Sequence, residues 1–139
     1  MTHTGASKTE IQLFLAQEFP QSRAVVVEAG QGAATVQHLV GEADLRPGGT
    51  VSGPTMMALA DVALYVAILG AIGIVPLTVT TSLTINFLRK PAANAHLLGV
   101  CKLIKLGQLL AVGEVSIYSE GSSDLVAHAV GTYAIPRKR

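Results

Sequence analysis

The most apolar stretch of the chain lies near its middle and has the pattern of a helix. Residues 53–70 read "GPTMMALADVALYVAILG", and apolar side chains fall on nearly every side of the turns. Pro54 suits a first helical position, and Ser52 or Gly53 suits the cap before it. A helix that is apolar all round must be enclosed, so the pattern predicts a buried helix that begins near Gly53.

Alternating apolar and polar positions on both sides of this helix predict strands. Two such stretches precede the helix and four follow it: 23–30 and 33–40, then 77–88, 96–106, 109–119 and 124–135. The joints between them are short, as antiparallel pairing allows. A short helix over 9–19 comes first, and 41–50 is a loop by composition. The expected architecture is α+β, with a six-stranded antiparallel sheet wrapped around one long central helix.

Length and composition favour one domain that associates with itself. The 139 residues suffice for a single core, so we expect one domain over 1–139, with an N-terminal helix region over 1–20 and a frayed basic tail over 137–139. Half of the residues are hydrophobic and 14% are charged. This surplus predicts that another copy of the chain covers part of the surface. The formal charge of +1 favours no nucleic-acid partner.

The sequence indicates neither a membrane protein nor a metal site. Residues 54–77 are long enough to span a bilayer, but Asp61 would lie inside it at a cost of about 2.5–3.5 kcal/mol. Cys101 is the single cysteine, which fits a reducing cytoplasm, and its alternating apolar run predicts a core side chain. The four histidines lack metal-ligand spacing, and the first residues lack the apolar run of a signal peptide. We expect a cytoplasmic protein without metal or redox cofactor.

Asp61 is the outstanding residue of the central helix. It is the only charged side chain between Arg46 and Arg89, and helical spacing places four apolar side chains on its face: Met57, Leu64, Tyr65 and Ile68. A buried carboxylate costs several kcal/mol unless it is hydrogen-bonded, protonated or at the edge of a wet cleft. Asp61 is therefore either a structural residue that bonds a neighbouring backbone, or a base or nucleophile.

The segment before the helix offers a second chemical group. Its sequence, "RPGGTVSGPT", brings Gly53 to the helix start, where backbone N–H groups and the macrodipole favour negative charge. The segment is a plain loop with a helix cap or, together with a carboxylate, the oxyanion donor of an acyl-transfer site. Gly53 and Asp61 are eight residues apart, or about 12 Å along one helix. They cannot both touch one carbonyl, so a shared site needs the donor from one subunit and the carboxylate from the other.

Two stretches of the sequence resemble a known family. The sequences "GGTVSGPTMMALADVAL" and "TTSLTINFLRKPA" are similar to the PaaI-type hotdog-fold thioesterases, and the resemblance runs from about Asp44 to the end. Its most specific element is a glycine eight residues before the acidic residue of the central helix, then a strand that ends in an aromatic and a nearby proline. The resemblance implies the hotdog fold, hydrolysis of an acyl-CoA thioester, and a homodimer that often pairs into a dimer of dimers.

The resemblance also implies roles for particular residues. Asp61 matches the catalytic carboxylate, a general base or nucleophile, and Gly53 matches the glycine whose amide polarises the thioester carbonyl. Thr80 falls where many members have a serine or threonine that positions the water or the carboxylate, and Thr81 takes this place if the register shifts by one. Ser52 stands where many members have a histidine, so carbonyl activation is weaker or differently arranged.

The remaining candidates would contact substrate. Arg46 stands where the family commonly has a polar residue, often asparagine, and becomes a candidate substrate contact. Arg89 and Lys90 either meet coenzyme A phosphates or form a solvated strand end. Met57 is either core filler or a wall of the acyl pocket.

Two other functions fit the same fold. Enoyl-CoA hydration usually uses an aspartate–histidine pair for acid–base chemistry, and no histidine is near Asp61 in sequence. A non-enzymatic acyl-CoA-binding or sensor module is the second alternative, because Ser52 replaces the common histidine. Hydrolysis of an acyl-CoA thioester, with Asp61 and Gly53 from two subunits, is the function that the sequence favours.

Overall fold

The computed structural model describes residues 5–137 of the chain. Its elements, in chain order, are α1 (Lys8–Glu18), β1 (Ala24–Gly30), β2 (Ala33–His38), the 3-10 helix η1 (Glu42–Asp44), β3 (Leu45–Arg46), β4 (Thr50–Val51), α2 (Gly53–Ile72), β5 (Val79–Phe87), β6 (Leu97–Leu106), β7 (Leu110–Ser119) and β8 (Leu125–Ala134). Residues 1–4 of the predicted N-terminal helix region and residues 138–139 of the predicted tail lie outside the described residues.

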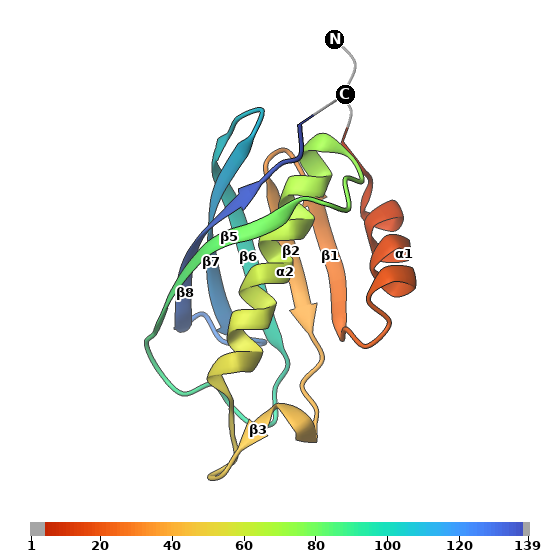
Figure 1. Cartoon of the computed structure of the whole chain (residues 1–139). Helices are drawn as coiled ribbons and strands as arrows, with labels where there is room; N and C mark the ends of the chain where they lie inside the picture. Colours follow the sequence, from red (N-terminus) through yellow and green to blue (C-terminus); the bar gives the residue numbers. More distant parts are fainter. Residues whose placement is uncertain (1–4, 138–139) are drawn as a thin grey trace.

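Six strands form one antiparallel sheet in the order β1-β2-β6-β7-β8-β5. The sheet curves around α2, and α1 lies beside β1 at one side (Figure 1). The predicted α+β hotdog architecture, with a six-stranded sheet around one long helix, is confirmed. Within the predicted loop 41–50, η1 and a small β3–β4 hairpin form, because Gly48 and Gly49 adopt the positive φ that its turn needs (100° and 80°).

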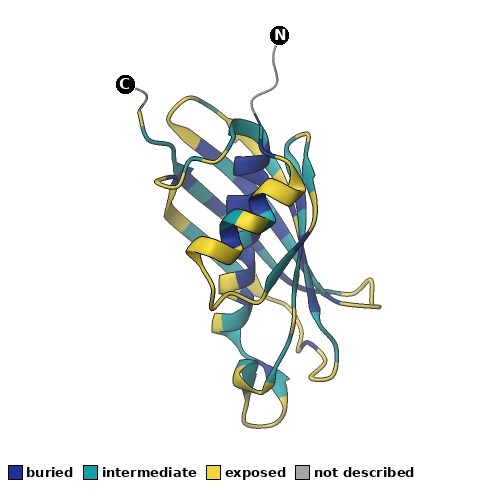
Figure 2. Ribbon diagram, turned by 90° about the vertical axis from the view of Figure 1, so that its right-hand side faces the viewer, coloured by how far each residue is buried: buried dark blue, intermediate teal, exposed yellow. Residues whose placement is uncertain are grey.

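The helix α2 is the core of the fold. The Ser52 side chain caps it by accepting a hydrogen bond from Thr55 N (3.3 Å), Pro54 lies in its first turn, and Gly73 ends it with a φ of 96°. Its length and composition would also suit a membrane span, but its middle and C-terminal turns are buried inside the curved sheet, as Figure 2 shows in dark blue. Enclosure by the sheet therefore accounts for its uniform apolarity.

Leu64 marks the closest approach of α2 to the sheet. Its side chain is fully buried above Gly113 and Gly131, which pair across β7 and β8. A Cβ atom would lie 2.5 Å from the Leu64 Cδ1 atom if added to Gly131, and 2.7 Å from Cδ2 if added to Gly113. The two glycines thus form a hollow that accepts the leucine, and any side chain there would push the helix outward.

We predict that Gly131→Ala destabilises the protein by about 1–3 kcal/mol through overpacking. Urea denaturation gives the free energy of unfolding, and Val130→Ala, on the outer face of the same strand, is the control with a smaller loss. Leu64→Ala leaves a cavity and costs about 2–5 kcal/mol alone. In the Leu64→Ala background, Gly131→Ala should lower the free energy of unfolding by less than it does in the wild type. An equal loss in both backgrounds would contradict the close packing of Leu64 against Gly131.

Candidate active site

Asp61 lies half-buried on α2 with one carboxylate oxygen fully engaged. Its Oδ1 atom accepts hydrogen bonds from Thr80 Oγ1 (2.7 Å) and from the Tyr133 hydroxyl (2.6 Å). The same hydroxyl is 2.8 Å from the Asp61 carbonyl oxygen. Among the described residues, no donor contacts Oδ2. The helical pattern places apolar side chains around Asp61, and two strands add hydroxyls that this pattern cannot reveal.

A bulge in β5 aligns these hydroxyls. Thr80 pairs with Tyr133 across β5 and β8, and the register then shifts between Thr80 and Ser82. The extra residue, Thr81, donates its hydroxyl to the Thr132 carbonyl (3.2 Å). Thr80, and not Thr81, is therefore the residue that contacts Asp61.

Sequence reasoning missed Tyr133, which is 3% exposed. Burial, followed by the hydrogen bond to Asp61 and the charge of Asp61, raises the pKa of its phenol well above the usual value. The group is thus a neutral donor at physiological pH. The sequence did offer one indication of Tyr133: it falls at an inward-facing position of the alternating strand β8, and a buried tyrosine hydroxyl usually has a hydrogen-bond partner.

A cavity of about 650 Å³ opens beside Asp61, between α1, α2 and residues of the sheet strands. Its size is that of a small-molecule site. Its walls are mostly apolar and come from α1, α2 and the strand ends: Leu15, Phe19, Ala58, Leu59, Val62, Tyr65, Pro76 and Val79. Its polar lining comes from Arg23, His38, Asp44, Asp61, Thr78, Thr80 and Tyr133, with Gln21 and Ser22 at one side. The cavity therefore offers a mostly apolar surface with two carboxylates, Asp44 and Asp61, in its wall.

Gly53 lines a different hollow, of about 730 Å³, which shares no lining residue with the first. Arg46, Arg89 and Lys90 line this second hollow as well. The structure thus brings the predicted carbonyl donor together with three predicted cationic contacts and keeps them apart from Asp61. An aromatic ring, Phe87 at the end of β5, lies over Gly53.

The other predicted contacts line neither hollow. Ser52 is engaged as the cap of α2, and Met57 is 41% exposed on the helix surface. Arg89, which lines the second hollow, donates its Nε–H to the Leu125 carbonyl (3.3 Å) and forms an exposed ion pair with Asp124 (4.0 Å). Burial, with the charge of Glu114, raises the pKa of Cys101 to about 12, which agrees with the predicted core side chain.

Within residues 5–137, no group of three or more histidine, cysteine or acidic side chains is arranged to hold a metal ion. The groups that could take part in a reaction are Asp61, Thr80 and Tyr133 at the first cavity and the Gly53 backbone N–H at the second hollow.

Comparison with known proteins identifies relatives with this fold. The model of the thioesterase superfamily matches residues 48–126. A structure from Silicibacter sp. TM1040, assigned as a thioesterase, is 41% identical over 98% of this chain and 95% of that chain, with a TM-score of 0.87. A variant of the phenylacetic acid degradation protein PaaI from Thermus thermophilus is 26% identical over 89% of this chain and 99% of that chain, with a TM-score of 0.73.

The PaaI protein of E. coli is 21% identical over 91% of this chain and 92% of that chain, with a TM-score of 0.72, and supports the fold alone. A search of curated protein sequences gave no match. The chain belongs to the thioesterase superfamily, as a PaaI-type hotdog protein, and the predicted resemblance is confirmed. Thioester hydrolysis is the class of reaction that this membership supports.

We predict that Tyr133→Phe lowers the free energy of unfolding by about 1.5–3 kcal/mol, because a hydrogen bond to a charged group is lost in a buried position. Tyr118→Phe is the matched control, since the Tyr118 hydroxyl makes no hydrogen bond among the described residues. Urea denaturation at neutral pH measures both variants. Equal stabilities for the two variants would show that the Tyr133 hydroxyl does not hold Asp61.

Proposed function

We propose that the protein hydrolyses acyl-coenzyme A thioesters at a site formed by two copies of the chain. The observation that carries this proposal is the state of Asp61: Oδ1 is held by Thr80 and Tyr133, and Oδ2 is left without a donor among the described residues at the wall of an apolar cavity. A carboxylate fixed in this way is oriented for one reaction at one atom.

Two chemical routes use this atom. As a general base, Oδ2 takes a proton from a water molecule, and the water oxygen attacks the thioester carbonyl. As a nucleophile, Oδ2 attacks the carbonyl itself, and water then hydrolyses the mixed anhydride. In both routes the carbon–sulfur bond breaks, the thiolate of coenzyme A leaves and takes up a proton, and the carboxylic acid is released. Mass spectrometry of the protein after turnover in ¹⁸O-labelled water tests the second route, because label in the Asp61 carboxylate requires an anhydride that water attacks on the Asp61 side.

The Gly53 amide is the proposed donor to the carbonyl oxygen, and it comes from the other subunit. About 12 Å of helix separates it from Asp61 in one chain, and the two residues line separate hollows. A two-fold axis beside β5, an edge strand of the sheet, would bring the two hollows together. The exposed apolar side chains on and beside that strand support burial there: Met57, Leu77, Val79, Phe87 and Leu88.

Coenzyme A would extend from the second hollow. Arg46, Arg89 and Lys90 line it, and no acidic side chain of the described residues does. Guanidinium and ammonium groups are the usual partners of phosphates in proteins. The acyl group would then lie in the cavity beside Asp61 of the partner chain.

The enoyl-CoA hydratase alternative gains one observation, because His38 lines the same cavity as Asp61. A panel of acyl-CoAs and enoyl-CoAs separates the functions. Free thiol release reports hydrolysis, loss of the enoyl absorbance without thiol release reports hydration, and binding without either change reports a sensor. We expect thiol release from saturated acyl-CoAs.

We predict that Asp61→Asn lowers kcat by about 10²–10⁴-fold, because the amide is neither a base nor a nucleophile. The variant should still bind acyl-CoA and keep the fold, since the amide oxygen can accept the two hydrogen bonds at the Oδ1 position. Thermal melting, coenzyme A binding and turnover are measured on one preparation. A variant that melts much earlier but keeps most of its activity would make Asp61 a structural residue.

We predict that Gly53→Pro lowers kcat by about 10²–10³-fold, because it removes one oxyanion donor. Proline suits the first helical position, and the extended backbone of Ser52 (φ −72°, ψ 155°) suits a residue before proline. Gly53→Ala is the control that keeps the N–H, and its added Cβ would make only an ordinary 3.4 Å contact with Phe87.

The same two variants test whether the site is shared. When Gly53→Pro and Asp61→Asn chains are co-expressed, a mixed dimer has one site with both defects and one intact site. Statistical mixing then restores about a quarter of wild-type activity. No recovery from verified mixed dimers would place each site within one chain.

A further inference from the structure

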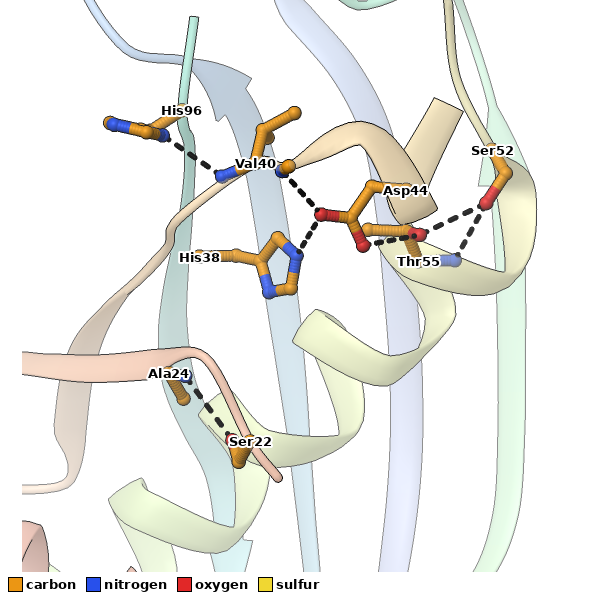
Figure 3. A network of polar contacts seen from close by, with 9 residues as sticks. Ser22, Ala24, His38, Val40, Asp44, Ser52, Thr55 and His96 are labelled. Atoms are coloured by element: carbon orange, nitrogen blue, oxygen red, sulfur yellow. Dashed lines mark hydrogen bonds and ion pairs between the residues drawn. The ribbon is translucent and has the colours of Figure 1, made fainter. Parts of the chain in front are cut away.

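A polar network joins the end of β2 to the first turn of α2 (Figure 3). Asp44, in η1, is at its centre. Its Oδ2 atom accepts a hydrogen bond from Gly41 N (2.8 Å), and His38 Nε2 lies 3.0 Å from the same oxygen. Its Oδ1 atom accepts a hydrogen bond from Thr55 Oγ1 (3.2 Å). One carboxylate thus connects a strand, a turn and a helix start.

The network continues from Asp44 to Ser52 by two routes. The Thr55 hydroxyl, which donates to Asp44, lies 2.9 Å from Ser52 Oγ and so accepts the serine proton. The Ser52 N–H donates to the Asp44 carbonyl oxygen (2.8 Å). A helix cap needs only the contact between Ser52 and the Thr55 N–H. The additional bonds fix the peptide that precedes Gly53.

The electrostatic setting keeps Asp44 charged. The Asp44 and His38 side chains are each 15% exposed. Burial raises the pKa of the Asp44 carboxyl, but the Gly41 N–H, His38 and the Thr55 hydroxyl outweigh burial and hold the pKa below its usual value. His38 Nε2 lies 3.0 Å from Asp44 Oδ2 and lowers the pKa of that carboxyl first as a hydrogen-bond partner and then through charge. Arg23 and Asp61 are the other charged groups on the same cavity.

We propose that Asp44 is a positioning residue, which holds the Ser52–Gly53 peptide so that the Gly53 N–H points at the thioester carbonyl. This inference rests on the proposed function of Gly53. The sequence feature that it explains is Ser52, whose hydroxyl is linked through Thr55 and Asp44 to His38 at the end of β2. The Asp44 carboxylate thus ties the residue before the Gly53 donor to a strand of the sheet.

The test compares Asp44→Asn, which keeps the shape and removes the charge, with Glu28→Gln, which removes the charge of an exposed side chain on β1. We expect Asp44→Asn to lower kcat by about 10- to 100-fold with little change in KM, because a displaced donor weakens the transition state more than substrate binding. In the Gly53→Pro background the same change should have no further effect on kcat. An additive loss, or an unchanged kcat beside an active wild type, would overturn the inference.

A second measurement does not depend on activity. The Ser52 N–H donates to the Asp44 carbonyl and the Thr55 N–H donates to Ser52 Oγ. Amide hydrogen exchange by NMR should be faster at Ser52 and Thr55 in Asp44→Asn than in the wild type, and unchanged in Glu28→Gln. Unchanged exchange at both amides would overturn the positioning role even in a protein that turns over no acyl-CoA. If exchange rises at these amides while the wild type is inactive on the panel, the positioning role stands and the proposed reaction falls.

Discussion

The burial of α2 is the constraint on which the rest of the structure depends. A 20-residue helix that is apolar on nearly every side cannot lie on a surface, so the sheet must curve around it. The curvature requires close approach at the centre, where Gly113 and Gly131 make room for Leu64. A cavity remains between the helix, α1 and residues of the sheet strands, and the one charged residue of the helix, Asp61, lines it.

The same constraint decides which parts of the fold and the site the sequence could predict. The alternation of apolar and polar residues in a strand and the uniform apolarity of a helix both indicate burial. The six strands, the long helix and the sheet around it could therefore be predicted from the sequence pattern. The importance of Asp61 followed as well, because a lone carboxylate in such a helix needs an explanation. The β3–β4 hairpin within 41–50 did not follow, since its strands have two residues each and carry no periodicity.

The partners of Asp61 were beyond sequence reasoning for a different reason. Thr80 and Tyr133 meet because β5 pairs with β8 in one register and because a bulge at Thr81 changes the phase of the strand. A shift by one residue would turn either hydroxyl to the other face. His38 is a similar case: its contact with Asp44 joins the end of β2 to η1, and nothing in the spacing of the four histidines indicates it. Family resemblance supplied Thr80, but it supplied neither Tyr133 nor Asp44.

The rigidity of α2 also determines how the two parts of the site can cooperate. A helix fixes the separation of its residues, so no loop motion within one chain can bring the Gly53 amide to a carbonyl that Asp61 attacks. Symmetry offers the economical solution, because a two-fold axis near the N-terminal half of α2 places the start of one helix beside the middle of the other. Strand β5 is the edge strand there: it pairs with β8 on one side, and apolar side chains are exposed along it. The apolar surplus of the sequence and the proposed divided site would then have one explanation: the surface that is costly to expose in one copy is the surface that would complete the site in two.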